Sequence, residues 1–206
     1  MENVNKMQVL VTGASGFIGK ALTEALLSEG YSVKALTRSF NKDFPKAVTV
    51  VRGDLCADEL NLGGIIDDCN VVIHCAGEPV NTEKMHAIHI EGIRKLLSEL
   101  HASVQRKQRG VQWVNLSSCG AYGQAVSDLQ KQRYIDESAP DNPKGEYECT
   151  KVEADNMVLK YAETYDWFRY TIIRPTTVFG VGMRSKAIVR LCKLIKKKLF
   201  FYVGNK

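Results

Sequence analysis

A glycine-rich turn close to the N-terminus constrains the fold of this chain more than any other feature. The turn reads Thr12-Gly13-Ala14-Ser15-Gly16-Phe17-Ile18-Gly19 and lies between an apolar run, residues 7–12, and a segment with helical spacing, residues 17–28. Glycines let the backbone turn tightly, approach a pyrophosphate and pack the helix onto the strand. The first N–H groups of that helix and its positive dipole end face the same phosphates. Because the motif requires this strand–turn–helix context, the segment predicts a dinucleotide-binding turn.

Short apolar runs alternate with amphipathic segments along the rest of the chain. The expected strands are residues 7–12, 31–37, 47–51, 70–75, 111–117 and 170–174, and the expected helices are residues 17–28, 83–107 and 147–165. Strands that are apolar on both faces and alternate with helices indicate a parallel sheet covered on each side. The expected fold class is therefore α/β, a doubly wound Rossmann fold over residues 1–182, whose ligands bind at the carboxyl ends of the strands.

Composition and charge exclude several classes of protein. No apolar run approaches the roughly 20 residues that cross a bilayer, and the N-terminus lacks the apolar core of a signal peptide, so we expect a cytoplasmic protein with no membrane partner. The net charge of +5 is due to residues 184–206, where eight basic residues and no acidic residue occur. Such a run is typical of a solvated helix face rather than of a nucleic-acid site. The six cysteines form no Cys-x-x-Cys pair, which predicts reduced thiols and no metal site.

Three residues further along form a candidate catalytic set. Ser118 follows the expected strand at residues 111–117, and Tyr147 and Lys151 are four residues apart, so that both project from one face of a helix. A phenol has a pKa of about 10, and a nearby ammonium favours its phenolate. Tyr147 can then exchange a proton with a substrate hydroxyl or carbonyl group while a hydride moves, and Ser118 would polarise the same oxygen.

Together these motifs resemble the extended branch of the short-chain dehydrogenase/reductase superfamily, the NAD-dependent epimerase/dehydratase family. The turn fits the pattern Thr-Gly-x-x-Gly-x-x-Gly, the catalytic set has the family's order, and Arg174-Pro175-Thr176-Thr177-Val178-Phe179-Gly180 is similar to the family's segment beside the nicotinamide. The resemblance implies an NAD(P)-dependent epimerase or ketoreductase that transfers hydride at a carbinol or ketone carbon of a nucleoside-diphosphate sugar, with Tyr147 as acid and base. The alternative is a non-catalytic NAD(P)-binding sensor or scaffold module.

The resemblance also assigns residues to the dinucleotide. Lys151 would bond the nicotinamide ribose, and Asp54 would lie at the adenine. Arg38 ends the second strand where NAD-binding proteins carry a carboxylate, and a guanidinium suits a 2′-phosphate, so that NADP is preferred over NAD. The expected cofactor-binding residues are Gly13, Ser15, Gly16, Phe17, Ile18, Gly19, Arg38, Asp54, Leu55, Cys75, Ala76, Gly77, His89, Tyr147, Lys151, Pro175 and Val178.

The sequence also departs from the family pattern. His89 stands where extended members commonly carry an asparagine, and Cys119-Gly120 replaces the Asp-Glu pair of the dehydratases, which disfavours dehydration. Family members run about a hundred residues further, so residues 183–206 are expected to be only the beginning of a truncated substrate-binding region. Relatives dimerise through the helices at residues 83–107 and 147–165, which implies a homodimer. The identity of the sugar and the direction of the reaction stay open.

Overall fold

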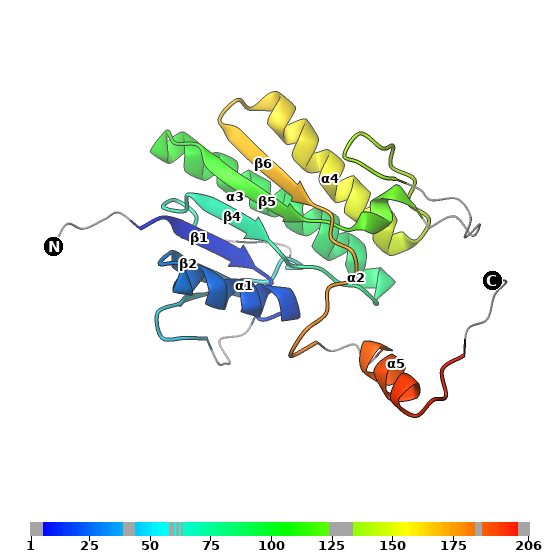
Figure 1. The fold of residues 1–206 in the computed structure, drawn as a ribbon. Helices are drawn as coiled ribbons and strands as arrows, with labels where there is room; N and C mark the ends of the chain where they lie inside the picture. The colour runs from blue at the N-terminus through cyan, green and yellow to red at the C-terminus, as the bar shows by residue number, and fades with distance from the viewer. Residues whose placement is uncertain are drawn as a thin grey trace. The chain divides into compact units, whose positions relative to one another are not determined.

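A six-stranded parallel sheet forms the centre of the structure, as the sequence predicts (Figure 1). The computed structural model describes residues 6–38, 44–57, 60, 62, 64–123, 134–183 and 187–201. The strands are β1 (Gln8–Thr12), β2 (Ser32–Thr37), β3 (Thr49–Arg52), β4 (Val71–His74), β5 (Val111–Leu116) and β6 (Phe168–Ile173), in the order β3-β2-β1-β4-β5-β6. The order reverses between β1 and β4, and doubly wound sheets bind ligands at this switch point, beyond the carboxyl ends of the strands.

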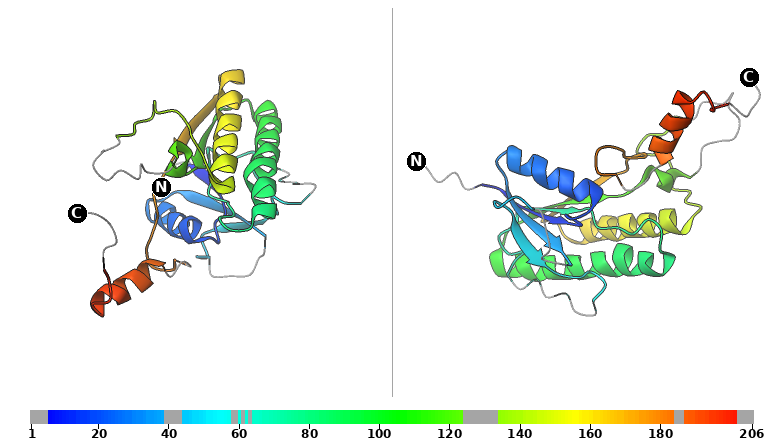
Figure 2. Two further views of the ribbon diagram at one scale, coloured as in Figure 1. Left: turned by 90° about the vertical axis from the view of Figure 1, so that its right-hand side faces the viewer. Right: turned by 90° about the horizontal axis from the view of Figure 1, so that it is seen from below.

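Helices lie on both faces of the sheet, which explains why the central strands β1 and β4 are mainly apolar on both sides. One face carries α1 (Phe17–Ser28), and the other carries α3 (Gly92–Lys107) and α4 (Glu146–Thr164) (Figure 2). The smaller core, on the side of α1, consists of Val9, Val11, Ala14, Val33, Ala35 and Val48. The larger core packs strand residues such as Leu10, Val72 and Trp113 against Ile93, Leu96 and Leu100 of α3 and against Ala154 and Val158 of α4.

The helix expected at residues 83–107 consists of three consecutive parts. It begins as α2 (Thr82–His86), continues as a π-helical turn, η1 (Ala87–Glu91), and ends as α3. The side chain of Asn81 caps α2 by accepting a hydrogen bond from the backbone N–H of Lys84 at 3.2 Å. A π-helical turn changes the direction of the side chains it carries and is frequent at functional sites. The only histidine in this turn is His89.

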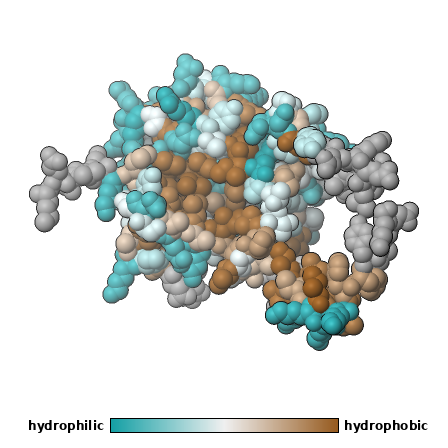
Figure 3. All heavy atoms as spheres, in the orientation of Figure 1, coloured by the Kyte–Doolittle hydropathy of each residue, from teal (hydrophilic) through white to brown (hydrophobic). Residues whose placement is uncertain are grey.

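The last strand starts two residues earlier than the sequence indicates. Phe168 pairs with Val111 at the beginning of β5, and its side chain is buried against Trp113 with 6.2 Å between the ring centroids. On the face of the sheet that carries α1, Ile173 is 45% exposed. Figure 3 shows apolar side chains gathered on this face beside α1. Within the described residues of the first 176, no helix covers this side of β6.

The contacts within the chain divide it into two units, residues 1–176 and residues 177–206. The second unit contains α5 (Ala187–Lys196), which carries Lys193 and Lys196 in its last turn. The expected division after residue 182, with a substrate-binding region beginning at residue 183, stays a prediction. None of the described helices combines the length and the apolar character needed to cross a membrane.

Candidate active site

The glycine turn at the end of β1 fits a phosphate group. Gly13 has a φ of +65°, and a Cβ atom on this residue would lie 2.7 Å from the Cα atom of Ala76 at the end of β4. A Cβ atom on Gly19 would overlap the carbonyl oxygen of Gly13, so α1 packs directly onto the turn. No side chain caps α1 at Gly16, and its first turn contains no acidic residue. A helix N-terminus of this kind is suited to bind an anion.

Thr12 fastens the turn to the neighbouring strand. Its hydroxyl oxygen accepts a hydrogen bond from the backbone N–H of Ala76 at 3.3 Å and lies 2.9 Å from Nδ1 of His74. The ring of His74 stacks on Trp113, and burial lowers its pKa to about 3, so the imidazole is neutral at physiological pH. The predicted segment Cys75-Ala76-Gly77 therefore lies directly beside the glycine turn, at the switch point of the sheet.

The ends of β2 and β3 carry the residues predicted to bind the adenosine half. Arg38 follows β2 and is exposed, and the hydroxyl of Thr37 lies 3.5 Å from that of Ser15 in the glycine turn. Asp54 follows β3, and its Oδ1 atom accepts a hydrogen bond from the backbone N–H of Cys56 at 3.0 Å. Leu55 is 7% exposed, so its side chain belongs to the core. The parallel register of β1, β2 and β3 brings these residues to one edge of the sheet.

The predicted catalytic residues come from the end of β5 and the start of α4. The Oγ atom of Ser118 accepts a hydrogen bond from the backbone N–H of Gly120 at 3.1 Å and thereby caps a short 3-10 helix, η2 (Cys119–Tyr122). Tyr147 is the second residue of α4, and Lys151 follows one turn later. Lys151 is 3% exposed, and its Nζ atom donates a hydrogen bond to the carbonyl oxygen of Leu116. This bond ties α4 to β5 just before Ser118.

The protonation states of this pair differ from the expectation. Burial lowers the pKa of Lys151 to about 8, although the carboxylate of Asp155 opposes the effect. Burial raises the pKa of the Tyr147 phenol, and the carboxylate of Glu148 raises it further. The phenol is therefore protonated at neutral pH. The expectation that Lys151 lowers this pKa is not met in the structure, where the ammonium group instead bonds the carbonyl of Leu116.

His89 is enclosed by protein atoms. Its Nε2 atom lies 3.0 Å from the backbone nitrogen of Glu78, its Nδ1 atom lies 2.8 Å from Oγ1 of Thr150, and the residue is 1% exposed. The ring also meets that of Tyr147 edge to face, with 5.6 Å between the centroids. Burial and the charge of Lys151 lower the pKa of His89 to about 4. Since both ring nitrogens have protein partners, this arrangement argues against the predicted direct contact with a dinucleotide.

A buried carboxylate in α4 organises the floor beneath these residues. Asp155 is fully buried and accepts hydrogen bonds from Asn115 at 2.8 Å and from the hydroxyl of Ser117 at 2.7 Å. It also forms an ion pair with Arg174, which follows β6, at 3.0 Å. The Asp155 cluster, defined here as these four residues, joins α4 to the carboxyl ends of β5 and β6. A buried ion pair is tolerated because its partners also satisfy its hydrogen-bonding capacity.

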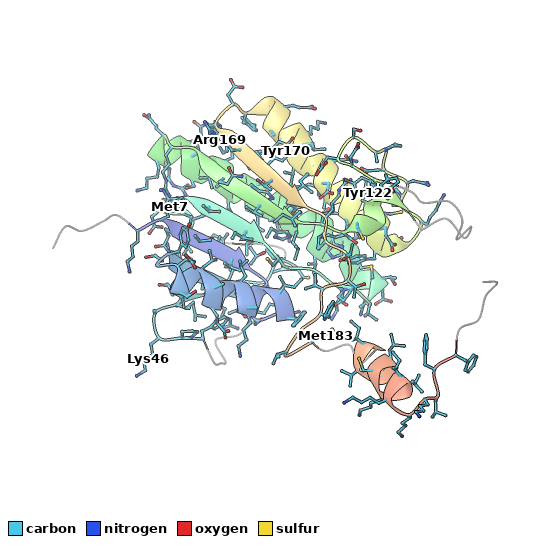
Figure 4. All side chains as sticks on the ribbon, viewed as in Figure 1. Met7, Lys46, Tyr122, Arg169, Tyr170 and Met183 are labelled. Atoms are coloured by element: carbon cyan, nitrogen blue, oxygen red, sulfur yellow. The ribbon has the colours of Figure 1, made fainter. Side chains whose placement is uncertain are left out.

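The same arginine extends the cluster toward the segment that precedes α4. A second ion pair joins Arg174 to Asp141 at 2.6 Å. The guanidinium group lies over the ring of Tyr122, 4.8 Å from its centroid, and Tyr122 is found beside the start of α4 (Figure 4). Next to this arginine, the carbonyl oxygen of Pro175 accepts a hydrogen bond from the backbone N–H of Cys119 at 3.0 Å. The predicted residue Pro175 therefore lies beside Ser118.

Glu148 is a candidate site residue that the sequence interpretation missed. A Cβ atom on Gly120 would lie 3.4 Å from Oε1 of Glu148 and 3.3 Å from Oγ of Ser118, so a carboxylate and the predicted catalytic hydroxyl flank the same point. A Cβ atom on Gly145 would overlap the same carboxylate. The two glycines make room for Glu148 from opposite sides. The only signal in the sequence is a glutamate next to Tyr147, which does not reveal that Gly120 faces it.

The fold defines an α/β domain that carries a glycine turn and a Ser, Tyr and Lys set at the carboxyl edge of one parallel sheet. Comparison with known proteins agrees, because residues 9–205 match the NAD dependent epimerase/dehydratase family. The chain belongs to this family.

Two relatives with different activities have nearly the same sequence identity to this chain. Human sterol-4-alpha-carboxylate 3-dehydrogenase (decarboxylating) is 28% identical over the whole chain, and the N-acetyl-alpha-D-glucosaminyl-diphospho-ditrans,octacis-undecaprenol 4-epimerase of Escherichia coli O157:H7 is 27% identical over 95% of it. The match covers 54% of the first relative and 56% of the second, so this chain spans about half their length. The structure of MoeE5 in complex with UDP-glucose and NAD is 27% identical, has a TM-score of 0.73 and covers 91% of this chain and 60% of that protein.

The structure thus brings most of the predicted site residues to one edge of one unit. Val178 is the exception, because it lies in the second unit, and its role stays a prediction. Among the described residues, no group of three His, Cys, Asp or Glu side chains is placed to hold a metal ion. All six cysteines are free thiols, and Cys69 is the one that is fully buried.

Proposed function

We propose that this chain is the dinucleotide-binding and catalytic part of an NAD(P)-dependent enzyme that moves a hydride at a secondary carbinol or ketone carbon. The observation that carries the proposal is that the three candidate residues come from elements at the same carboxyl edge of the sheet as the glycine turn. Ser118 lies at the end of β5, and Tyr147 and Lys151 lie on the first turns of α4, which a buried hydrogen bond ties to β5. Family membership supports the same reaction class.

Each residue has a distinct role in this chemistry. A bound nicotinamide supplies the hydride donor or acceptor. In the reducing direction the Tyr147 phenol, which is protonated at neutral pH, gives its proton to the carbonyl oxygen as the carbon receives hydride. In the oxidising direction the phenolate takes the hydroxyl proton as the C–H bond gives up hydride. Ser118 donates a hydrogen bond to the same oxygen, and Lys151 holds the start of α4 on β5 through its bond to the carbonyl of Leu116.

Two features of the chain support binding of the dinucleotide. The glycine turn packs closely against the end of β4 and the start of α1 only because Gly13 and Gly19 carry no side chains, and α1 begins there without a cap, so its first N–H groups can bind an anion. Arg38 favours a 2′-phosphate and hence NADP, whereas MoeE5 was solved with NAD. Measured dissociation constants for NAD and NADP, with an Arg38→Asp variant, separate the two. If Arg38 binds the 2′-phosphate, the variant weakens binding of NADP alone.

A nucleoside-diphosphate sugar is the substrate class that we favour, because MoeE5 was solved with UDP-glucose and the E. coli relative is an epimerase of a diphosphate-linked sugar. The sterol dehydrogenases favour a second candidate, a sterol 3-hydroxyl group beside a carboxylate, since one of them matches the whole chain. Both candidates require hydride transfer at a secondary carbon. Turnover with each substrate class discriminates between them: net oxidation of a sterol reduces the dinucleotide and is followed at 340 nm, whereas epimerisation of a sugar returns the hydride and is followed by analysis of the product sugar.

The decisive experiment compares the chain with its Tyr147→Phe variant. We expect the variant to bind the dinucleotide normally and to lose turnover roughly a hundred- to ten-thousandfold, as loss of a general acid–base does. Equal turnover in both proteins contradicts the assignment. Dinucleotide binding with no turnover on either substrate class instead favours the sensor or scaffold module. Dinucleotide retained through purification indicates an epimerase, and its release indicates a reductase.

The remaining predictions concern the surroundings of the enzyme. A cytoplasmic location and a homodimer built on the helices α3 and α4 both remain proposals, which fractionation and sedimentation analysis can test.

A further inference from the structure

The hydrogen bonds around His89 determine which of its ring nitrogens carries the proton. A backbone N–H can only donate, so Nε2, which lies 3.0 Å from the nitrogen of Glu78, must be the bare nitrogen that accepts. The ring proton is then on Nδ1, which donates to Oγ1 of Thr150 at 2.8 Å. Because that oxygen is already accepting, its own hydrogen points to the carbonyl oxygen of Tyr147, 3.0 Å away. Only this set of proton positions gives every donor in the chain of hydrogen bonds an acceptor, from the backbone N–H of Glu78 to the carbonyl oxygen of Tyr147.

We propose that His89 is a positioning residue, fixed as the neutral Nδ1–H tautomer, that holds the backbone of Tyr147 at a set distance from the loop after β4. This inference rests on the proposed function and adds a residue to it. The His89 relay, as we name the chain of bonds from Glu78 through His89 and Thr150 to Tyr147, starts in the loop after β4 and ends on the proposed proton-transfer residue.

The point at which the relay ends is significant. In an α-helix the carbonyl oxygen of Tyr147 also accepts a hydrogen bond from the backbone N–H of Lys151. The His89 relay therefore ends on the carbonyl group that joins the backbones of the two candidate catalytic residues. The edge-to-face contact between the two rings fixes the phenol from a second direction. Movement of either the loop or the π-helical turn that carries His89 would therefore displace Tyr147 and Lys151 together.

The surroundings of the imidazole support the neutral form. The ammonium charge of Lys151 opposes a second positive charge on the imidazole, and the carboxylate of Glu78 has a smaller effect of opposite sign on the pKa of His89. On the other side, a Cβ atom on Gly77 would lie 3.3 Å from Nε2, closer than most such contacts. The glycine at position 77, which belongs to the predicted dinucleotide-binding loop, thus lets that loop approach the bare nitrogen. A side chain there would push the relay apart.

Nuclear magnetic resonance of histidine labelled with 15N tests the tautomer without any assay of turnover. In the full chain at neutral pH we expect Nδ1 of His89 to carry a proton and Nε2 to be bare, with the signals of the four histidines assigned through a His89→Gln variant. An Nε2–H tautomer or an imidazolium ion overturns the proposal. Because this reading needs no substrate, it stands or fails independently of the proposed reaction.

Variants of Thr150 test whether the relay positions Tyr147. Thr150→Val removes the hydroxyl but keeps the shape, and we expect kcat to fall roughly three- to tenfold with KM for the dinucleotide unchanged, as for one lost hydrogen bond. Thr150→Ser should restore both kcat and the protected Nδ1 proton. Thr164→Val is the matched control, because the hydroxyl of Thr164 bonds only the carbonyl of Lys160 near the other end of the same helix. If Thr150→Val behaves like this control, His89 has no positioning role.

Discussion

Lys151 donates a hydrogen bond to the carbonyl oxygen of Leu116, which lies two residues before Ser118. The bond secures the two halves of the candidate active site to each other, and it does so with a cation that is almost entirely buried. Burial costs the charged form more than the neutral form, and the pKa of Lys151 falls to about 8 as a result. The lysine therefore titrates close to physiological pH.

The stability of the chain should rise with pH on the basic side of neutrality. Between pH 8 and 10.5 the folded chain has lost the Lys151 proton that the unfolded chain still binds, and the free energy of unfolding increases wherever the unfolded state binds more protons. Urea titrations at pH 7.5 and pH 10 measure the effect. In a Lys151→Met variant this rise should disappear, and turnover should be lost as well. A rise of equal size in the variant would show that other groups cause it.

Acid should destabilise the chain through two histidines. Burial lowers the pKa of His74 to about 3 and that of His89 to about 4. As the pH falls below 6.5, both histidines therefore stay neutral in the folded chain, whereas in the unfolded chain each of them binds a proton. The contribution of the two histidines to the free energy of unfolding should be complete above pH 6.5. As the pH falls below 6.5, the free energy of unfolding should decrease with a slope that corresponds to about two protons per molecule. A His74→Phe variant should halve the slope. The exposed residue His86 provides the control, since His86→Gln should leave the slope unchanged.

Removal of the Glu148 charge should make the phenolate of Tyr147 easier to form. The Glu148 carboxylate raises the pKa of the phenol, second only to the effect of burial, so a Glu148→Gln variant should have a lower pKa at Tyr147. The pH profile of alcohol oxidation would then move toward lower pH, and NMR of tyrosine labelled with 13C at Cζ would report the same shift without substrate. Glu153→Gln, on the exposed face of the same helix, should leave the profile in place. An unmoved profile in Glu148→Gln would mean that this carboxylate does not reach the phenol.

The close packing of the glycine turn can be tested with alanine substitutions at two glycines that both have a positive φ angle. Gly13 and Gly30 both have positive φ angles, +65° and +84°, so an alanine at either position costs about 1–2 kcal/mol of stability. A Cβ atom on Gly30 meets nothing within 4 Å, whereas one on Gly13 would overlap the backbone of Ala76. We expect Gly13→Ala to lose about 1–3 kcal/mol more than Gly30→Ala, as overpacking does, and to lose dinucleotide binding. Calorimetry with and without NAD measures both effects, and equal behaviour of the two variants would contradict the proposed cradle.

The sequence was sufficient to predict features that depend on local pattern. The glycine turn, the alternation of strands and helices, and the spacing of Tyr147 and Lys151 all follow from residues close together in the chain. The boundaries of β6 were less accessible, because Phe168 belongs to the strand through its burial against Trp113 rather than through alternation.

Features that depend on distant contacts could not be read in the same way. Glu148 faces Gly120 only after α4 has docked on β5, and the bond between Asn115 and Asp155 joins residues 40 positions apart. The tautomer of His89 likewise depends on Thr150, which is 61 residues away. The sequence marks His89 as a departure from the family pattern, but only the packing reveals its partners.

The Asp155 cluster limits how this part of the chain can change during evolution. One carboxylate without access to water serves two donors from β5 and its end and one arginine after β6, so a neutral replacement at position 155 would leave a hydroxyl and an amide without their acceptor and Arg174 with the ion pair to Asp141 alone. A neutral substitution at position 174 removes the ion-pair partner of the buried Asp155 carboxylate, and a paired replacement avoids this cost. Homologues that have lost the arginine at position 174 should therefore also have lost the carboxylate at position 155.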